Sequence, residues 1–460
     1  MMKALDLKPT DKNIYDAFID DKIGRREQVL NFVKMLNVIE DNCVVALEGN
    51  WGSGKTFFVK QVQMVINANN KYYEPANSSS IIAENKNEII QKCARFQTKD
   101  GCTELKPQVC VYYDAWQNDN DEDPMISLVY SIIKETDSDF SFNCPNVIEI
   151  FSAIGDLFLK KDFSKLIEGI KGTNVLQKIR EEKDGETIIS NFLQSLLPEK
   201  GERLVVFVDE LDRCNPSYAV KVLERIKHYF ANERITFVFS VNTNELQHTI
   251  RKHYGDDFNA TRYLDRFFDI RVELPQPDFE RYLFSINFYH QGSIFNAMCT
   301  AVINKFHLEM RGAAKFIRLA NMAVPKYLRE VSEMYQSASD ICVSYIVPIV
   351  IGLKLTDIQA FEKFVNGEDG SSMMEFREEF RRGFFANCVN EKNQALDAEK
   401  TGLSEQRLEE KMNEIYRAIF VERYDESREI KIGNVWFDKS AKNRVMSIVG
   451  LLHDSVNFDE

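Results

Sequence analysis

The stretch "GNWGSGKT" (residues 49–56) has the composition and spacing of a phosphate-binding loop. The residues that fit the pattern G-x-x-x-x-G-K-[ST] are Gly49, Gly54, Lys55 and Thr56. In such a loop, glycines let backbone N–H groups approach phosphate oxygens, the lysine reaches the β and γ phosphates, and the hydroxyl binds Mg²⁺. An apolar run precedes the stretch and a helical pattern follows it, so a helix N-terminus would face the phosphates. The pattern therefore predicts nucleotide binding rather than an ordinary tight turn.

Two carboxylates follow a second apolar run, "VVFVDE" (205–210). Four apolar residues before Asp209 are typical of a Walker B strand, whose aspartate binds Mg²⁺ directly or through water. Glu210 would polarise the water that attacks the γ-phosphate. A cap for the next helix is the competing interpretation of both residues, and the phosphate-binding loop upstream disfavours it.

Two later residues are further catalytic candidates. Asn242 ends the apolar run in "VFSVNTNEL" (238–246), where a polar sensor would reach the γ-phosphate or the attacking water, but Asn also suits a helix N-cap. Arg266, in "YLDRFFDIRVELP" (263–275), resembles the arginine-Phe element of AAA+ domains, and Arg262 lies one helical turn earlier. A solvated helix face is the alternative for a lone arginine.

Five short apolar, β-branched runs must position these residues. Nearly continuous apolar runs are typical of strands buried on both faces of a parallel sheet, and helical patterns separate them, which predicts a doubly wound α/β domain. The runs are residues 43–49, 108–115, 203–210, 234–241 and 268–275. A glutamate beside the Mg²⁺ aspartate and an extra strand between the two motifs point to the ASCE division of P-loop NTPases, with sheet order 5-1-4-3-2. Guanine recognition would need N-K-x-D after a strand, and the nearest string, "NKNE" (85–88), lies in a polar insertion, so we expect ATP.

The runs and the intervening patterns predict three parts. Residues 1–277 form the nucleotide-binding domain, interrupted by a surface-loop insertion (67–107) and a helical insertion (117–202). A helical lid region (278–335) follows, and a mainly helical C-terminal domain completes the chain. That last domain covers residues 336–460, with Ser404 as an expected N-cap and a possible hairpin at residues 428–438.

Composition limits the classes of function. The chain has 460 residues and a formal net charge of −13, from 58 basic and 71 acidic side chains. This balance argues against a large nonspecific nucleic-acid surface, although a local basic groove stays open. The nine cysteines and six histidines are scattered, without a C-x-x-C pair, so we expect reduced thiols and no structural zinc.

Nothing in the sequence suggests secretion or a membrane span. The first 13 residues lack the apolar core of a secretory signal. The longest apolar run, residues 341–353, is too short to cross a bilayer as a helix and is interrupted by Pro348, so it reads as a buried helix. We therefore expect a cytoplasmic protein.

Taken together, the motifs resemble those of the KAP family of P-loop NTPases. The strings that carry the resemblance are "GNWGSGKTFF" (49–58), "VYYDAWQNDNDEDPMISLVYSI" (111–132) and "VDELDRCNP" (208–216). The second contains Trp116, and Asp123-Pro124 would begin a helix there. The resemblance spans residues 15 to about 335. The chain lacks the inserted transmembrane helices of many members, so it looks like the soluble bacterial members, several of which act in phage defence or plasmid exclusion.

The resemblance also implies a set of nucleotide-binding residues. Gly24, in "DDKIGRREQVLNFVKML" (20–36), belongs to an N-terminal element that packs near the adenine. Arg311 would be the sensor-2 arginine, with Lys326 as the alternative. The implied loop contacts are Gly49, Asn50, Trp51, Gly52, Ser53, Gly54, Lys55, Thr56 and Phe57.

The predicted function is a Mg²⁺-dependent ATPase that drives a conformational change or assembly with partner proteins, including ATP-dependent self-association. Three other classes remain. A P-loop kinase would usually be shorter and carry an arginine-rich lid, which is not evident. A nucleic-acid translocase would share the ATPase core but fits the acidic balance poorly. A nucleotide-binding switch without turnover would have little use for Glu210.

Overall fold

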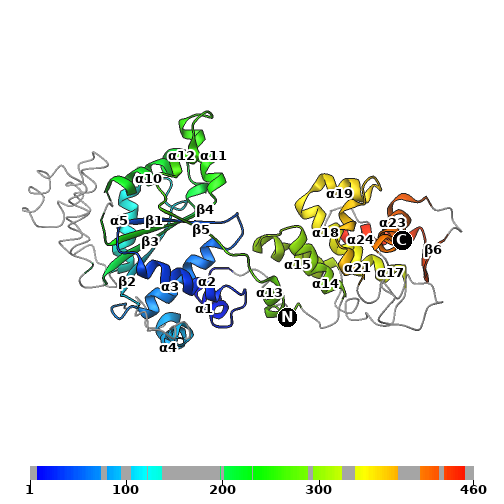
Figure 1. Cartoon of the computed structure of the whole chain (residues 1–460), viewed down its shortest axis with the longest axis horizontal. Helices are drawn as coiled ribbons and strands as arrows, with labels where there is room; N and C mark the ends of the chain where they lie inside the picture. Colours follow the sequence, from blue (N-terminus) through cyan, green and yellow to red (C-terminus); the bar gives the residue numbers. More distant parts are fainter. Residues whose placement is uncertain are drawn as a thin grey trace, which may run out of the picture. The chain divides into compact units, whose positions relative to one another are not determined.

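The computed structural model describes residues 8–73, 80–94, 105–121, 123–136, 197, 201–229, 232–288, 294–323, 337–381, 405–423 and 429–450. The chain divides into two units, residues 8–277 and the residues from Asp278 onward. Figure 1 shows a sheet with helices in the first unit and helices in the second.

A five-stranded parallel sheet forms the centre of the first unit. Its order, β2-β3-β4-β1-β5, is the predicted order 5-1-4-3-2 viewed from the other side, so the predicted fold class is confirmed. Three central strands are almost wholly buried, whereas β5 at the edge alternates between half-buried and exposed residues. The strands are β1 (Cys43–Glu48), β2 (Gln108–Asp114), β3 (Arg203–Asp209), β4 (Ile235–Val241) and β5 (Ile270–Glu273).

The register of the sheet brings the chemically active strand ends together. Asp209, at the end of β3, pairs with Asp114 of β2 on one side and with Ser240 of β4 on the other. Glu48 of β1 pairs with Val241 of β4, so the phosphate-binding loop begins at the same edge. This carboxyl edge is where ligands bind in open α/β sheets.

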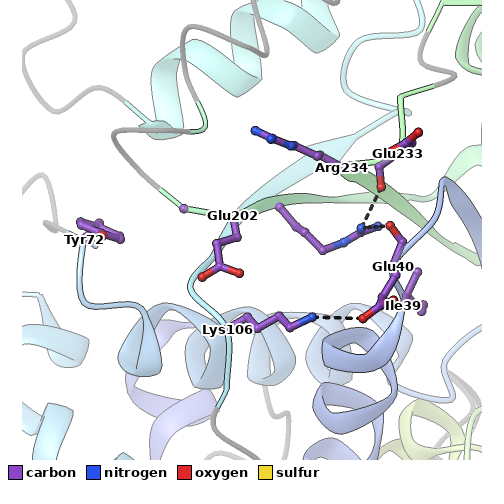
Figure 2. A pocket seen from close by; sticks show the side chains of 9 residues that line it. Ile39, Glu40, Tyr72, Lys106, Glu202, Glu233 and Arg234 are labelled. Carbon is purple, nitrogen blue, oxygen red and sulfur yellow. Dashed lines mark hydrogen bonds and ion pairs between the residues drawn. The ribbon is translucent and has the colours of Figure 1, made fainter.

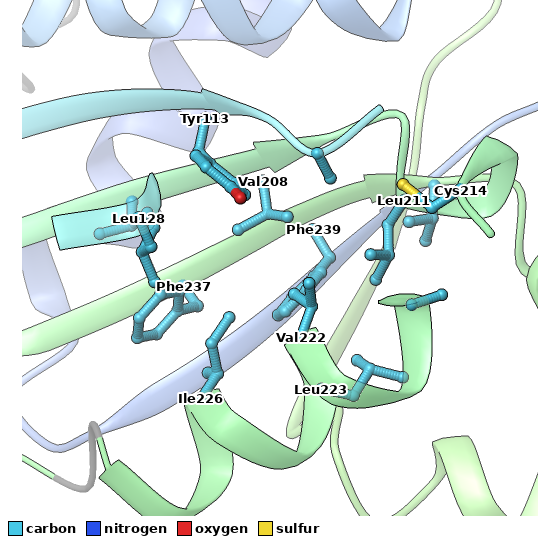
Figure 3. Packing of buried hydrophobic residues seen from close by; sticks show 14 of the residues in the cluster. Tyr113, Leu128, Val208, Leu211, Cys214, Val222, Leu223, Ile226, Phe237 and Phe239 are labelled. Atoms are coloured by element: carbon cyan, nitrogen blue, oxygen red, sulfur yellow. The ribbon is translucent and has the colours of Figure 1, made fainter. Parts of the chain in front are cut away.

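Helices cover both faces of this sheet (Figure 1). On one face lie α1 (Asp11–Ile19), α2 (Arg26–Val38), α3 (Lys55–Asn69) and α4 (Ile81–Ala94). On the other lie α5 (Pro124–Thr136), α10 (Pro216–Tyr229), α11 (Thr243–Tyr254) and α12 (Ala260–Leu264). Figure 3 shows the core on this second side, where Leu223 and Ile226 of α10 pack against Phe237 and Phe239 of β4. Burial of these side chains is the main force that holds the strand ends in place.

The insertion between β1 and β2 differs from the sequence prediction. Residues 67–107 were expected to form a surface loop, but α3 continues to Asn69 and α4 occupies residues 81–94. Ile89 is fully buried in α4, and Ser80 accepts a hydrogen bond from the Ala83 N–H at the start of the helix. The α4 helix packs on α3 and α1, and the apolar stripe that makes these contacts is short enough for the polar composition to conceal it.

The helical insertion is only partly described. The α5 helix begins at Pro124, as Asp123-Pro124 suggested, and the Met125 N–H donates to Asp123 Oδ1 over 3.0 Å. The other helices expected between residues 117 and 202 lie outside the described residues, apart from Leu197.

The second unit is mainly helical. In the region 428–438, for which a hairpin was expected, β6 and β7 pair antiparallel. Ser404, the expected N-cap, lies outside the described residues. The elements are α13 (Phe279–Ser285), α14 (Ile294–Lys305), α15 (Met310–Ala323), α17 (Ala338–Ile341), η2 (Cys342–Ile346), α18 (Val347–Thr356), α19 (Ile358–Val365), α20 (Ser371–Met374), α21 (Arg377–Arg381), α23 (Glu405–Tyr416), η3 (Arg417–Val421), β6 (Ile430–Ile432), β7 (Val435–Phe437) and α24 (Ser440–Gly450).

One apolar helix passes through Pro348 rather than being interrupted there. Residues Ala338–Thr356 form 19 continuous helical residues, and their length and composition would suffice to cross a membrane, but 67% of this apolar stretch is buried inside the protein. The segment before the proline is a π-helix, in which the Val347 N–H donates to the Cys342 carbonyl. A π-turn widens the helix locally, which accommodates a residue that has no N–H. The expectation that Pro348 interrupts the helix was therefore wrong, whereas the burial agrees with a core helix.

Candidate functional site

The phosphate-binding loop connects β1 to α3 at the carboxyl edge of the sheet. Gly54 precedes the first residue of α3 at φ 94°, a left-handed conformation that a residue with a Cβ rarely adopts. A Cβ at Gly49 would lie 2.8 Å from Ser53 Oγ, so the loop also closes too tightly there for a larger residue. The loop thus takes the shape that the glycine spacing predicts.

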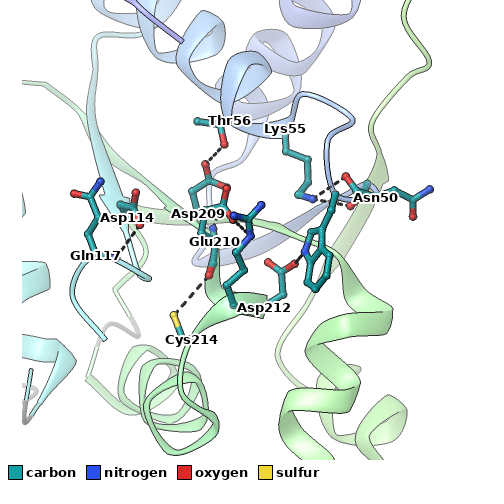
Figure 4. Close-up of polar contacts among 12 residues, drawn as sticks. Asn50, Lys55, Thr56, Asp114, Gln117, Asp209, Glu210, Asp212 and Cys214 are labelled. Atoms are coloured by element: carbon teal, nitrogen blue, oxygen red, sulfur yellow. Dashed lines mark hydrogen bonds and ion pairs between the residues drawn. The ribbon is translucent and has the colours of Figure 1, made fainter. Parts of the chain in front are cut away.

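Lys55 points its ammonium group into this loop. Its Nζ donates to the Gly49 carbonyl over 2.7 Å and to the Asn50 carbonyl over 3.2 Å (Figure 4). Burial lowers the pKa of Lys55, while the nearby carboxylates, Asp212 first, oppose that shift. A phosphate in the loop would offer the ammonium a charged partner in place of two neutral carbonyls.

Thr56 and Asp209 together offer the oxygen ligands that suit Mg²⁺. Thr56 Oγ1 donates to Asp209 Oδ2 over 2.6 Å (Figure 4). The Tyr112 hydroxyl donates to the same oxygen over 2.9 Å. Mg²⁺ at nucleotide sites usually takes one or two protein oxygens, with water and phosphate completing its shell. Within the described residues, no group of three or more His, Cys, Asp or Glu forms a conventional metal site. The pair Thr56–Asp209 fits a nucleotide-bound cation and not a permanent protein-held one.

Glu210 has an unusual backbone and a tight ion pair. Its φ is 60°, and its side chain makes no capping bond to the 3₁₀ turn η1 (Leu211–Arg213), which it precedes. Instead, Arg213 Nε donates to Glu210 Oε2 over 2.5 Å. Burial raises the pKa of Glu210, and the charge of Asp209 raises it further, whereas Arg213 lowers it. The sequence left Glu210 as either a catalytic base or a helix cap, and its side chain does not make the hydrogen bond that a cap would make.

Two exposed tryptophans flank Arg213. Its guanidinium carbon lies 5.8 Å from the ring centroid of Trp51 and 5.5 Å from that of Trp116. The Trp51 indole is fixed by Nε1, which donates to Asp212 Oδ2 over 2.5 Å. Trp51 is 46% exposed and Trp116 is 51% exposed, so both rings are partly open to solvent beside Arg213.

The structure places Asn242 at the carboxyl edge, where it caps a helix. Its side-chain oxygen accepts from the Asn244 N–H over 3.2 Å and from the Glu245 N–H over 3.4 Å, at the start of α11. A side chain engaged in this way serves as an N-cap. A contact with the γ-phosphate stays a prediction.

Arg266 lies away from the phosphate-binding loop of its own chain. Its carbonyl accepts from Lys227 Nζ over 2.6 Å, and Lys227 is in the last turn of α10, the helix that leaves the carboxyl edge after β3. A helix rises about 1.5 Å per residue, so this last turn lies roughly 15 Å from the carboxyl edge. The side chains of Arg266 and Arg262 are exposed.

The structure tests neither sensor-2 candidate, so both assignments stay predictions. Arg311 is exposed on α15 of the second unit, whose position relative to the sheet domain is not determined. Lys326 lies outside the described residues.

Arg25, beside the predicted Gly24, holds the phosphate-binding loop. Gly24 has φ 67° and leads into α2, and Arg25 is only 2% exposed. Arg25 Nη1 donates to the Ser53 carbonyl over 2.9 Å. The sequence analysis missed Arg25 as well as Tyr112. An arginine directly after the glycine of "IGRREQ" and a tyrosine two residues before the end of β2 were the available signals.

The comparisons with known proteins address the family. The model of the KAP family P-loop domain matches residues 25–283, which is more than half of the chain and begins at Arg25. A comparison with curated protein sequences finds no match. Among solved structures, the ORC2 protein of Aeropyrum pernix, determined in ADPNP and ADP complexes, aligns over 94% of this chain and 95% of its own, with 11% identity. Its TM-score is 0.32, a value too low to carry an argument.

Proposed function

Because the chain belongs to the KAP family of P-loop domains, we propose that it is a Mg²⁺-dependent ATPase whose ATP binding and hydrolysis drive a conformational change or assembly with partner proteins. The observation that carries this proposal is the meeting of Thr56, Asp209 and Glu210 at one strand end, next to the Lys55 ammonium. Each group is of the type that phosphoryl transfer from a nucleotide requires.

Different residues of the site would bind the phosphates, hold the metal ion and accept the proton. The loop N–H groups and Lys55 would bind the phosphates, while Thr56 and Asp209 would hold Mg²⁺, which would neutralise phosphate charge. Glu210 would take a proton from the attacking water, and its raised pKa makes it a better base than an ordinary glutamate. Tyr112 would orient Asp209 through its hydroxyl.

The direct test is phosphate release from ATP by the purified full chain, with Mg²⁺ and with EDTA. Release that requires both Mg²⁺ and the Lys55 side chain is expected. ATP binding without any release would support the regulatory switch instead. GTP hydrolysis at an equal rate would contradict the preference for adenine.

Self-association is the second part of the proposal. Arg266 is exposed and lies roughly 15 Å from its own carboxyl edge, which supports action on the nucleotide of a neighbouring subunit. An arginine supplied in this way contributes on the order of 10³-fold in rate. Arg266→Ala should bind ATP normally but hydrolyse it slowly.

A mixing experiment tests this part. The Lys55→Ala variant lacks ATP binding but presents Arg266, and the Arg266→Ala variant has the opposite defect. Mixed oligomers should recover part of the activity that neither variant has alone. If mixed oligomers form, as measured by mass, and no activity returns, Arg266 does not act between subunits. The matched control is Arg262→Ala, one turn earlier.

A further inference from the structure

Arg213 binds the carboxylate on which the proposed hydrolysis depends. The Arg213 and Glu210 side chains are 25% and 22% exposed, and their contact of 2.5 Å lies within one 3₁₀ turn. A guanidinium favours the ionised form of its carboxylate and so weakens that carboxylate as a proton acceptor. Glu210 is therefore a weaker general base while this pair is closed than after the pair has opened.

The backbone at Glu210 supports a switch role for the pair. Glu210 adopts φ 60° and ψ 23°, a left-handed conformation that non-glycine residues rarely take. Such conformations persist only where the surroundings fix them, and they cluster at switches and active sites. Here the Glu210 N–H donates to Asp209 Oδ1 over 3.0 Å, and the Glu210 carbonyl accepts from the Arg213 N–H over 3.1 Å. The turn thus holds both partners of the ion pair at fixed positions beside the metal ligand Asp209.

The two tryptophans let Arg213 change its anionic partner without leaving its place. An aromatic face attracts a cation but does not neutralise its charge. Arg213 lies within 6 Å of the ring centroids of Trp51 and Trp116, and Trp51 belongs to the phosphate-binding loop. The guanidinium can therefore turn from Glu210 toward the loop and keep aromatic neighbours on the way.

The γ-phosphate of ATP is the anion that suits this position. Arg213 lies beside Trp51 of the phosphate-binding loop, and Lys55 Nζ binds the Gly49 and Asn50 carbonyls of the same loop, so the two cations flank one loop and can attract one anion together. A terminal phosphoryl group presents paired oxygens to the guanidinium fork. ADP has no such group at that position.

We propose that Arg213 leaves Glu210 for the γ-phosphate when ATP binds, so that one movement detects the third phosphate and frees the base. This inference rests on the proposed ATPase function. Only hydrogen-bond partners are exchanged, and no covalent bond changes. With ADP bound, the Arg213–Glu210 pair stays closed.

The test is the affinity of the full chain for the Mg²⁺ complexes of ADPNP and ADP, measured by calorimetry. Arg213→Ala should lower the affinity for ADPNP about tenfold or more, the usual scale of a charge-assisted hydrogen bond, and leave that for ADP unchanged. Arg213→Lys should fall between Arg213→Ala and the wild type. Glu210→Gln should tighten ADPNP only, because no ion pair must then be broken. The double variant Glu210→Gln with Arg213→Ala should behave like Arg213→Ala alone.

A matched control separates this effect from loss of an arbitrary ion pair. Arg225 Nη2 contacts Asp123 Oδ2 over 2.9 Å in the same unit, so Arg225→Ala should change neither affinity selectively. Equal effects of Arg213→Ala on ADPNP and ADP, or no gain from Glu210→Gln, would overturn the inference and leave the ATPase proposal intact. Wild-type protein that binds neither nucleotide would overturn both.

Discussion

The two edges of the parallel sheet hold their charged side chains in different ways. At the carboxyl edge, Glu210 and Asp209 bind other side chains, namely Arg213, Thr56 and Tyr112. At the amino edge, a buried arginine binds mainly backbone. Arg203, the first residue of β3, donates to three carbonyls and one hydroxyl: Glu40 O at 2.6 Å, Glu233 O at 2.7 Å, Asp41 O at 2.8 Å and Thr236 Oγ1 at 3.1 Å.

The amino edge also has a cavity, of about 630 Å³ (Figure 2). Three cationic and three acidic side chains line it, so their charges balance. Lys106 contacts Glu40 at 3.5 Å across it. The charged lining residues are Glu40, Lys106, Glu202, Arg203, Glu233 and Arg234.

The contrast shows what makes a charged group available for function. Arg203 is fixed, because it binds three carbonyls in the segments that lead into β1 and β4, together with the Thr236 hydroxyl of β4. Side-chain partners can rotate away, so Glu210 and Asp209 at the carboxyl edge could exchange theirs for a ligand. Lys55 at the same edge binds two carbonyls of the phosphate-binding loop. A count of charged residues would not distinguish the two edges, but the identity of their partners does.

Removal of one lysine from each edge should give the largest difference. Lys55→Ala should weaken Mg²⁺-ATP binding by about a hundredfold or more, because the phosphates lose their buried cation. Lys106→Ala, at the amino edge, is the matched control and should leave the affinity unchanged. Titration with a fluorescent ATP analogue measures both. Equal affinities of the two variants would contradict the assignment of the loop.

The glutamates at the two edges should differ almost as much. Glu210→Gln should lower kcat for ATP hydrolysis about 10²- to 10³-fold, since it removes the proton acceptor but keeps the shape, and ATP binding should persist. Glu233→Gln, at the amino edge, should hydrolyse ATP like the wild type. Steady-state phosphate release provides the comparison. A Glu210→Gln variant at the wild-type rate would show that this carboxylate is not the base.

For stability, unlike for activity, we expect the larger effect at the amino edge, from Arg203 rather than from Arg213. Arg203→Ala should lower the free energy of unfolding by about 2–4 kcal/mol, because three carbonyls and the buried Thr236 hydroxyl lose their donor. Arg213→Ala should cost about 1 kcal/mol or less, because its ion pair is partly exposed. Urea unfolding followed by circular dichroism gives both values. A larger loss for Arg213→Ala would contradict the distinction between fixed and exchangeable partners.

A smaller effect is expected from the Tyr112 hydroxyl, which binds Asp209, the proposed metal ligand. Tyr112→Phe removes one of the two hydrogen bonds to Asp209 Oδ2 and should raise the Mg²⁺ concentration needed for half-maximal hydrolysis about three- to tenfold. Tyr113→Phe is the control, because the Tyr113 hydroxyl contacts Ser127 and Tyr218 in the core. A change in Mg²⁺ requirement in both variants would point to general loosening of β2.

The smallest expected effect is on the pH at which kcat/KM falls on acidification, the acid limb of its pH profile. This limb reports the ionisation of groups in the free enzyme. Burial and the charge of Asp209 raise the pKa of Glu210. Activity should therefore fall on acidification at a pH above about 4.3, the ordinary pKa of a glutamate. Arg213 lowers this pKa, so Arg213→Ala should move the acid limb to higher pH. If the acid limb lies at the same pH in the wild type and in Arg213→Ala, a group other than Glu210 controls the pH dependence.

The sequence was sufficient to predict those motifs whose residues have a fixed spacing along the chain. The loop glycines and Lys55 lie together within residues 49–56, and Asp209 and Glu210 are consecutive at the end of a second apolar run. The apolar runs predicted the order of the strands through the known topology of such domains. The confirmed fold and family follow from these patterns. The roles of the individual site residues stay predictions.

What the sequence could not predict depends on contacts between distant segments. Arg25 donates to the Ser53 carbonyl and Tyr112 donates to Asp209 Oδ2, and no local sequence pattern predicts either contact. The α4 helix has too few apolar residues to stand out, and its stability comes from packing on α3. The passage of a helix through Pro348 depends on a π-turn, which has no sequence signature that we could apply.

The strand register described above has an electrostatic consequence. Because Asp114 lies opposite Asp209 in the β2–β3 pairing, the fold brings two carboxylates together beside Glu210. Burial raises the pKa of Asp114, and the charge of Asp209 raises it further. Like charges held together in this way repel one another, and the surrounding core must restrain them. A cation bound between them would relieve that repulsion, so part of its binding free energy would appear as added resistance of the whole sheet to unfolding.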